Sequence, residues 1–118
     1  MKPTQNFESL PLWEPLMAFV KEIYSITEFF SESEKNGMGQ KLRDKATNIP
    51  MLLAAALSSN GKISAADAKT ALVETETLLI VCKHLDIITP ALNESLQEDI
   101  QQLGAQLNAL TQRINKNM

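Results

Sequence analysis

The sequence has little with which to build a catalytic or metal centre. Among its 118 residues there is one cysteine, Cys82, and one histidine, His84. A structural zinc site needs four ligands, and a nucleophile needs a base within hydrogen-bond reach. Cys82 and His84 are two positions apart, so on one helix they point to different faces and cannot pair. We therefore predict that the chain is not an enzyme and that it holds no metal or cofactor.

Other signatures of chemistry are also absent. Glu74 and Glu76 are two apart, and the Glu-x-x-His pattern of di-iron bundles does not occur. We expect Glu74 to face a polar partner such as Arg43. Gly37-Met38-Gly39 is not followed by the Lys-Ser or Lys-Thr of a phosphate-binding loop. No window approaches the roughly 20 apolar residues of a membrane span, and the N-terminus lacks an apolar leader, so we expect a cytoplasmic protein.

What is present is the composition of a folded helical domain. Hydrophobic residues make up 44% and charged residues 21%, which is ordinary for a globular protein and unlike a disordered one. Four glycines and five prolines leave long stretches free of helix breakers, and β-branched residues never alternate with polar ones over a strand's length. The length suits one core. We predict a single all-α domain over residues 1–118.

Four segments repeat apolar residues at intervals of three and four, which is the period of an amphipathic helix. The predicted helices cover about residues 10–30, 34–57, 64–85 and 90–115. Their core stripes are Trp13, Leu16, Val20, Ile23, Thr27 and Phe30; Met38, Leu42, Ala46, Ile49, Leu53 and Ala56; Ala68, Leu72, Thr75, Leu79 and Cys82; and Leu92, Leu96, Ile100, Leu103, Leu107, Leu110 and Ile114. Because the connections are short, consecutive helices must run antiparallel. The prediction is an up-down-up-down four-helix bundle.

Local signals predict where the helices begin and end. The polar run at residues 31–33 is predicted to separate the first helix from the second. Pro50 interrupts the second segment, but strong helix formers resume at once, so we predict one helix kinked at Pro50 rather than two helices. Ser64 has the form of an N-cap for the third helix. Thr89 and Pro90 predict the start of the fourth helix, as its cap and its first residue.

The charges are unevenly distributed. The net charge is −3, yet residues 35–69 carry six basic and two acidic side chains. On a helix, Lys41 and Lys45 stack at i, i+4 and form a basic strip. The residues that could contact RNA or an acidic partner are Lys35, Lys41, Arg43, Lys45, Lys62 and Lys69. The alternative is a solvated helix face, since Trp13 and Tyr24 are expected on the core side of the first helix, where bases could not stack on them.

Apolar residues also occur outside the predicted core stripes, in a larger number than a lone small bundle is expected to cover. They are Met17, Phe19, Ile26, Phe29, Leu52, Leu57, Leu78, Val81 and Ile87. One interpretation is a wider core. The other is an apolar surface through which the chain associates with its own copies.

The order of certain packing residues resembles a family of small bacterial bundles. In the first half these residues are Trp13, Ile23-Tyr24-Ser25-Ile26-Thr27, Phe30, Glu34, Gly37-Met38-Gly39-Gln40-Lys41-Leu42-Arg43, Ala46 and Ile49-Pro50. This half resembles the four-helix-bundle proteins encoded in 23S rRNA intervening sequences. The second half resembles the related Avd, the accessory variability determinant of diversity-generating retroelements, through Ala66-Asp67-Ala68, Glu74, Leu78-Leu79, His84-Leu85, Ile88, Ile100, Leu103-Gly104 and Leu107.

The resemblance implies an antiparallel four-helix bundle that assembles as a ring, typically a pentamer. In the Avd branch it implies a ring that binds a reverse transcriptase and its RNA through a basic surface. The chain departs from the family after Pro50, where Met51–Leu57 replaces a Ser-Asn-Ile-Ala-Glu-Gly stretch followed by arginines. We therefore expect a non-catalytic, homo-oligomeric accessory or scaffold protein that contacts a reverse transcriptase or RNA. The alternative is a protein-only interaction module without a nucleic-acid role.

Overall fold

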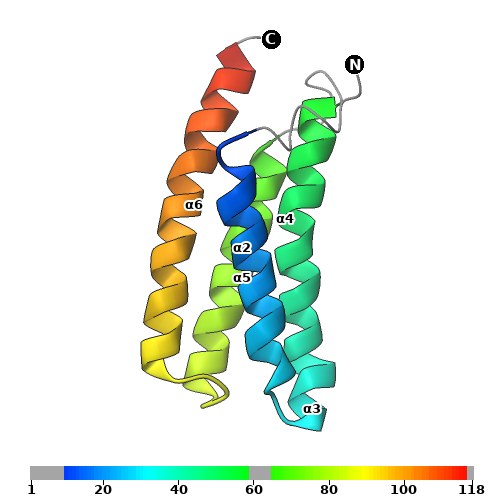
Figure 1. Ribbon diagram of the computed structural model, residues 1–118, viewed down its shortest axis with the longest axis vertical. Coiled ribbons are helices and arrows are strands. Elements are labelled where there is room, and N and C mark those ends of the chain that lie inside the picture. The colour runs from blue at the N-terminus through cyan, green and yellow to red at the C-terminus, as the bar shows by residue number, and fades with distance from the viewer. Residues whose placement is uncertain (1–9, 59–64, 117–118) are drawn as a thin grey trace.

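The chain is helical over the residues that the computed structural model describes, 10–58 and 65–116 (Figure 1). Four long helices lie side by side in a bundle of 44 × 23 × 21 Å. They are α2 (Trp13–Glu28), α4 (Gln40–Ser58), α5 (Ala66–His84) and α6 (Pro90–Lys116). Each packs against the next and runs in the opposite direction, which confirms the predicted up-down-up-down four-helix bundle. None of these described helices is long and apolar enough to cross a membrane.

One hydrophobic core runs along the inside of the bundle. Every predicted stripe residue within α4 and α5 is buried, so both stripes are confirmed. In α6, Leu92 is half-buried, the next five stripe residues are buried, and the side chain of Ile114 lies outside the described part. In α2 the stripe differs by one position, because Phe19 is buried where Val20 was expected. Apolar spacing therefore predicted which face of each helix meets the core.

The connection between α2 and α4 is itself helical. Ser31 accepts a hydrogen bond from the backbone N–H of Glu34 at 3.3 Å and caps the short helix α3 (Glu32–Glu34). One π-helical turn, η1 (Lys35–Gly39), then leads directly into α4. The second helical segment therefore begins two residues earlier than predicted, and only the capping residue of the polar run remains outside it.

Gly39 allows η1 to pack closely against Phe30 and the end of α3. A Cβ atom at this position would come within 3.2 Å of the Glu34 carbonyl oxygen and 3.4 Å of the Phe30 ring. Gly37, in the same turn, would have nothing within 4 Å of such an atom. A π turn holds one residue more than an α turn, and the apolar period alone gave no sign of this extra residue.

The remaining boundaries follow the predictions closely. α4 passes through the buried Pro50, which confirms one helix rather than two, whereas the kink at this residue stays a prediction. α5 begins at Ala66, and Ser64, the expected cap, lies outside the described residues. α6 begins at Pro90, where the Thr89 hydroxyl accepts a hydrogen bond from a backbone N–H at 3.1 Å, as predicted.

Candidate functional site

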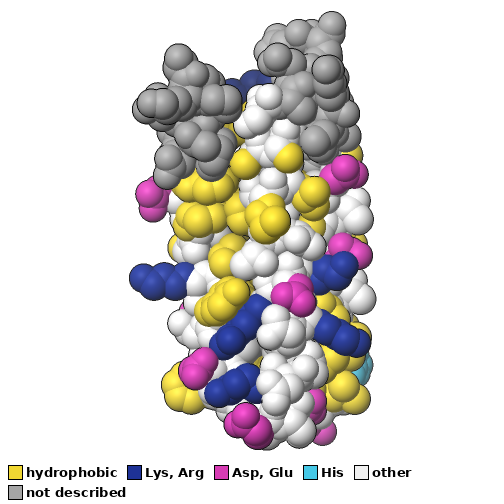
Figure 2. All heavy atoms as spheres, turned by 90° about the vertical axis from the view of Figure 1, so that its right-hand side faces the viewer, with side chains coloured by type: hydrophobic (Ala, Val, Ile, Leu, Met, Phe, Trp, Pro, Cys, Tyr) yellow, Lys and Arg dark blue, Asp and Glu magenta, His cyan; other side chains and the backbone are white. Residues whose placement is uncertain are grey.

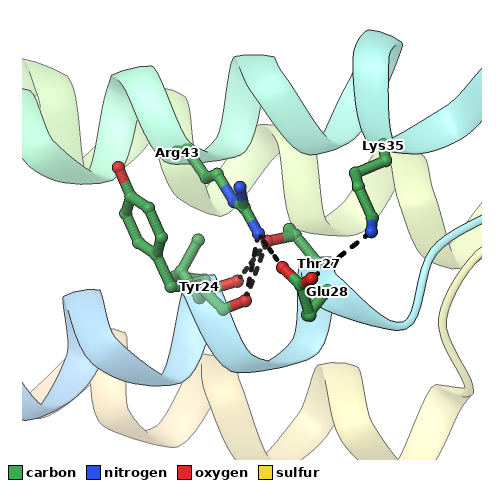
Figure 3. A network of polar contacts seen from close by, with 6 residues as sticks. Tyr24, Thr27, Glu28, Lys35 and Arg43 are labelled. Atoms are coloured by element: carbon green, nitrogen blue, oxygen red, sulfur yellow. Dashed lines mark hydrogen bonds and ion pairs between the residues drawn. The ribbon is translucent and has the colours of Figure 1, made fainter. Parts of the chain in front are cut away.

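Arg43 is the centre of a polar network that joins α4 to α2 (Figure 3). Its Nε donates to the Thr27 hydroxyl at 2.7 Å, and its Nη2 donates to the backbone carbonyl of Tyr24 at 3.3 Å. The same Nη2 lies 3.0 Å from Glu28 Oε2. The fully buried Thr27 hydroxyl donates in turn to the Ile23 carbonyl at 2.8 Å. The guanidinium of Arg43 is therefore used within the bundle.

Glu28 is shared between two of the residues predicted to contact a partner. Lys35 Nζ lies 3.4 Å from Glu28 Oε1, opposite the contact of Arg43 with Oε2. The pKa of the Glu28 carboxyl lies below its ordinary value because Arg43 donates a hydrogen bond to it and Lys35 adds a second positive charge. One carboxylate thus offsets part of the positive charge of both basic residues.

Lys45 has a partner on the other side of α4. Its Nζ lies 3.2 Å from Glu74 Oε2, in a half-exposed ion pair between α4 and α5. Glu74 therefore faces a polar partner, as expected, but within the described chain this partner is Lys45 and not the suggested Arg43. Arg43 points toward α2 whereas Glu74 approaches from α5, and the sequence could not show on which side of α4 each residue lies.

The other predicted contact residues are spread out. Lys69 donates to Asn108 of α6. Lys41 is exposed and has no ion pair with any described residue, and Lys62 lies outside the described part of the chain. Figure 2 shows the face that α4 presents, with Lys and Arg on its lower half interspersed with Asp and Glu, and hydrophobic side chains above them. The predicted strip is a mixed surface in which most basic residues are paired.

Tyr24 does not lie in the core, contrary to prediction. Its side chain is 43% exposed, and the Arg43 guanidinium carbon lies 4.6 Å from the centre of its ring. The residue follows Ile23, which is fully buried, so it falls just outside the core stripe. One face of the only tyrosine ring is consequently occupied by a cation from α4.

A surface groove of about 490 Å³ runs between α4 and α5 beside the Lys45–Glu74 pair. Lys41 lines the same groove, so the structure brings Lys41 and Lys45 together. The full lining is Lys41, Asp44, Lys45, Val73, Glu74, Thr77 and Leu78. The α4 wall of the groove is charged, and the α5 wall combines the apolar Val73 and Leu78 with Glu74 and Thr77.

Most of the apolar residues outside the predicted stripes are covered by the chain itself. Phe19 is buried, and six others pack half-buried against the core. They are Met17, Ile26, Leu52, Leu57, Leu78 and Ile87. Phe29 and Val81 remain exposed, at 89% and 38%. A wider core therefore accounts for most of this set. The exposed apolar surface also includes residues outside the set, namely Val73, Ile80 and Leu85.

The outer face of α5 carries a run of exposed side chains without a Lys, Arg, Asp or Glu residue. Thr70, Val73, Thr77, Ile80, Val81 and His84 are exposed at helical spacing, opposite the core, and we call them the α5 outer stripe. Val73 is 48% exposed, Ile80 and Val81 are each 38% exposed, and Leu85, just after the helix, is 59% exposed. Sequence reasoning singled out only Val81. The signal was that α5 has apolar residues on its outer side as well as on its core side, which is unusual for a surface helix.

Cys82 and His84 lie on opposite sides of α5, as predicted. Cys82 is fully buried and His84 is exposed. Burial raises the pKa of the Cys82 thiol to about 11, and the negative charge of Glu34 adds to this shift. The thiol is therefore protonated near neutral pH, in its poorly nucleophilic form. Among the residues with described positions, no three His, Cys, Asp or Glu side chains are placed to hold a metal ion.

Four antiparallel helices around one core define a small four-helix-bundle protein. The family of 23S rRNA-intervening sequence proteins matches residues 8–109, and the chain belongs to this family. The resemblance of its first half is thereby confirmed, while the relation to Avd stays a prediction. No individual curated protein matches the chain.

Proposed function

We propose that this chain is a non-catalytic, homo-oligomeric scaffold protein of the intervening-sequence type, which acts by binding copies of itself. The observation that supports it is the α5 outer stripe, an exposed helix face without a Lys, Arg, Asp or Glu residue. Apolar surface of this kind on a small protein marks an interface, because covering it removes hydrocarbon from water. The number of copies, five in a ring, is proposed from the family resemblance alone.

The absence of catalysis is part of the same proposal. Its support is that Cys82, the single thiol, is buried and protonated, and that His84 lies outside hydrogen-bond reach of it on another face. Nucleophilic catalysis needs an activated thiolate beside its base. Cys82 and His84, the two residues on which such chemistry would depend, are therefore not placed to act together.

Sedimentation velocity over a range of protein concentrations tests self-association. We expect a species larger than the 13.1 kDa chain, and a ring of five would sediment at about 65 kDa, five times that mass. Apolar contacts should persist at high salt, whereas assembly through surface charges would weaken. A monomer at every concentration would contradict the proposal.

Contact with RNA or a reverse transcriptase is a second proposal, supported by the resemblance and by the pair of lysines at the α4–α5 groove. If Lys41 and Lys45 bind phosphates, labelled RNA should bind at low salt and dissociate steeply as salt rises. Replacing both lysines by glutamate should abolish this binding, whereas Lys21→Glu, an exposed position on α2, should change it little. If RNA does not bind even at low salt, the RNA proposal is wrong, and the alternative of a protein-only interaction module is favoured.

A further inference from the structure

The α5 outer stripe consists of residue types that a permanently solvated helix does not favour. Five of its members are β-branched, namely Thr70, Val73, Thr77, Ile80 and Val81. Such side chains lose χ1 freedom in a helix and have lower helix propensity than Lys, Glu or Ala. They also have little rotamer entropy left to lose when a partner covers them. The stripe therefore weakens an isolated helix and favours a packed interface.

The exposed apolar residues of α5 match one another when a second α5 is laid against them in reverse. With a two-fold axis next to Ile80, Val73 faces the partner's Leu85. Thr77 then faces the partner's Val81, and the two Ile80 side chains meet beside the axis. A two-fold contact is isologous, so each of these pairings occurs twice. The arrangement covers every large apolar side chain that α5 and its C-cap leave exposed.

The charges beside the stripe match in the same register. Glu76 and Lys83 are half-buried, lie seven residues apart on one flank of α5, and have no ion pair with a described residue. That flank adjoins α6, since Lys69, seven residues before Glu76, donates to Asn108 of α6. Across an antiparallel two-fold contact the same flanks meet, and Glu76 lies beside the partner's Lys83. Both unpaired charges are thereby paired.

The groove between α4 and α5 lies on the opposite flank and offers space for protruding side chains. Its α5 wall includes Val73 and Thr77, which face the partner's Leu85 and the partner's Val81 in this register. Leu85 follows the groove-lining Leu78 by seven residues, so it projects on the same flank. Each chain would place its Leu85 in the groove of the other.

We propose that two copies of this chain bind each other through the α5 outer stripe, antiparallel about a two-fold axis next to Ile80, with reciprocal Glu76–Lys83 pairs. This inference rests on the proposed function, because it names the surface through which copies associate. A cyclic ring uses two different surfaces of each chain, whereas a two-fold contact uses one surface twice. The contact therefore joins chains, or whole rings, in pairs.

The size of the contact sets its strength. Residues 73–85 span about 20 Å of helix at 1.5 Å per residue. This is less than half of the 44 Å length of the bundle. The buried area consequently falls at the small end of protein interfaces, where association is weak and depends on concentration.

A charge swap tests the register directly. E76K and K83E each place like charges at both reciprocal positions, whereas the double variant E76K/K83E restores opposite charges. We expect each single variant to raise the Kd of the two-fold contact about tenfold, and the double variant to return it to within about threefold of the unchanged protein. E98K, at an exposed position on α6, is the matched control and should have no effect.

Sedimentation equilibrium gives the Kd, and circular dichroism verifies that each variant is folded. L85D, at an exposed position, should weaken the contact independently of the charges. If the protein associates but the double variant is no stronger than the single variants, the two-fold contact is wrong and the proposed self-association remains. If the unchanged protein is monomeric throughout, both fail. Rescue by the double variant supports the proposed register, because it requires Glu76 of one chain to lie beside Lys83 of the other.

Discussion

Replacement of Leu79 by alanine should lower the free energy of unfolding by about 3 kcal/mol. Leu79 is fully buried in the common core, on the face of α5 opposite the outer stripe. Truncation removes the transfer free energy of the side chain and leaves a cavity that four packed helices cannot easily close. Chemical denaturation at a protein concentration below that of any association measures the change.

The neighbouring residue provides the control for this prediction. Ile80 is 38% exposed and points away from the core, so Ile80→Ala should cost less than about 1 kcal/mol in the dissociated chain. The two substitutions remove similar volumes from adjacent positions of one helix. Equal losses would mean that the rotation of α5 about its axis is different from the one described.

Replacement of Arg43 by alanine should have the second-largest effect, a loss of about 2 kcal/mol. Arg43 donates to the buried Thr27 hydroxyl and to the carbonyl of Tyr24, and it forms an ion pair with Glu28. Its removal leaves the Thr27 oxygen without its charged donor at 2.7 Å. The measurement is again chemical denaturation, with the change in midpoint compared at constant slope.

Two further variants separate the geometry of this network from its charge. Arg43→Lys keeps the charge but cannot reach several acceptors with a planar fork, so it should recover less than half of the loss. Lys35→Ala removes only the exposed pair with Glu28 and should change stability much less than Arg43→Ala does. If Lys35→Ala costs as much as Arg43→Ala, charge rather than hydrogen bonding supports the contact between α2 and α4.

The sequence was sufficient for the features that depend on neighbours along the chain. Apolar residues at intervals of three and four predicted the buried faces of α4 and α5 because the helical period is a local property. Thr89 and Pro90 predicted the start of α6 because a capping hydroxyl and a fixed φ act within one turn. The up-down order followed from short connections between strongly periodic segments.

Features that depend on how helices rotate against one another were missed. Glu74 pairs with Lys45 rather than with Arg43 because α5 and α2 lie on different sides of α4. Tyr24 was missed for a local reason, because it follows the stripe residue Ile23 and so points to one side of the core. The π turn was missed for another reason, since one residue inserted between two helical segments changes their apolar spacing very little.

The candidate site shows the limit of counting charge along a chain. Residues 35–69 carry an excess of four positive charges, which predicted a basic surface. In the folded chain, carboxylates from outside this segment lie against it, Glu28 from α2 and Glu74 from α5. The exposed apolar face of α5 was missed for a different reason. Helical periodicity identifies one apolar face, which is assigned to the core, whereas α5 has a second apolar face on its outer side.

The position of Arg43 couples any binding at its guanidinium to the folding equilibrium. All the contacts that hold it in place join α4 to α2, so an anion that captured this side chain would have to replace them. By mass action, a ligand that prefers the released side chain stabilises states in which α2 has separated from α4. Such an anion would lower the thermal stability of the bundle, whereas a partner that binds the outside of α5 would raise it. The direction of the change in melting temperature therefore distinguishes an anion that displaces the contacts of Arg43 from a partner that binds the intact bundle.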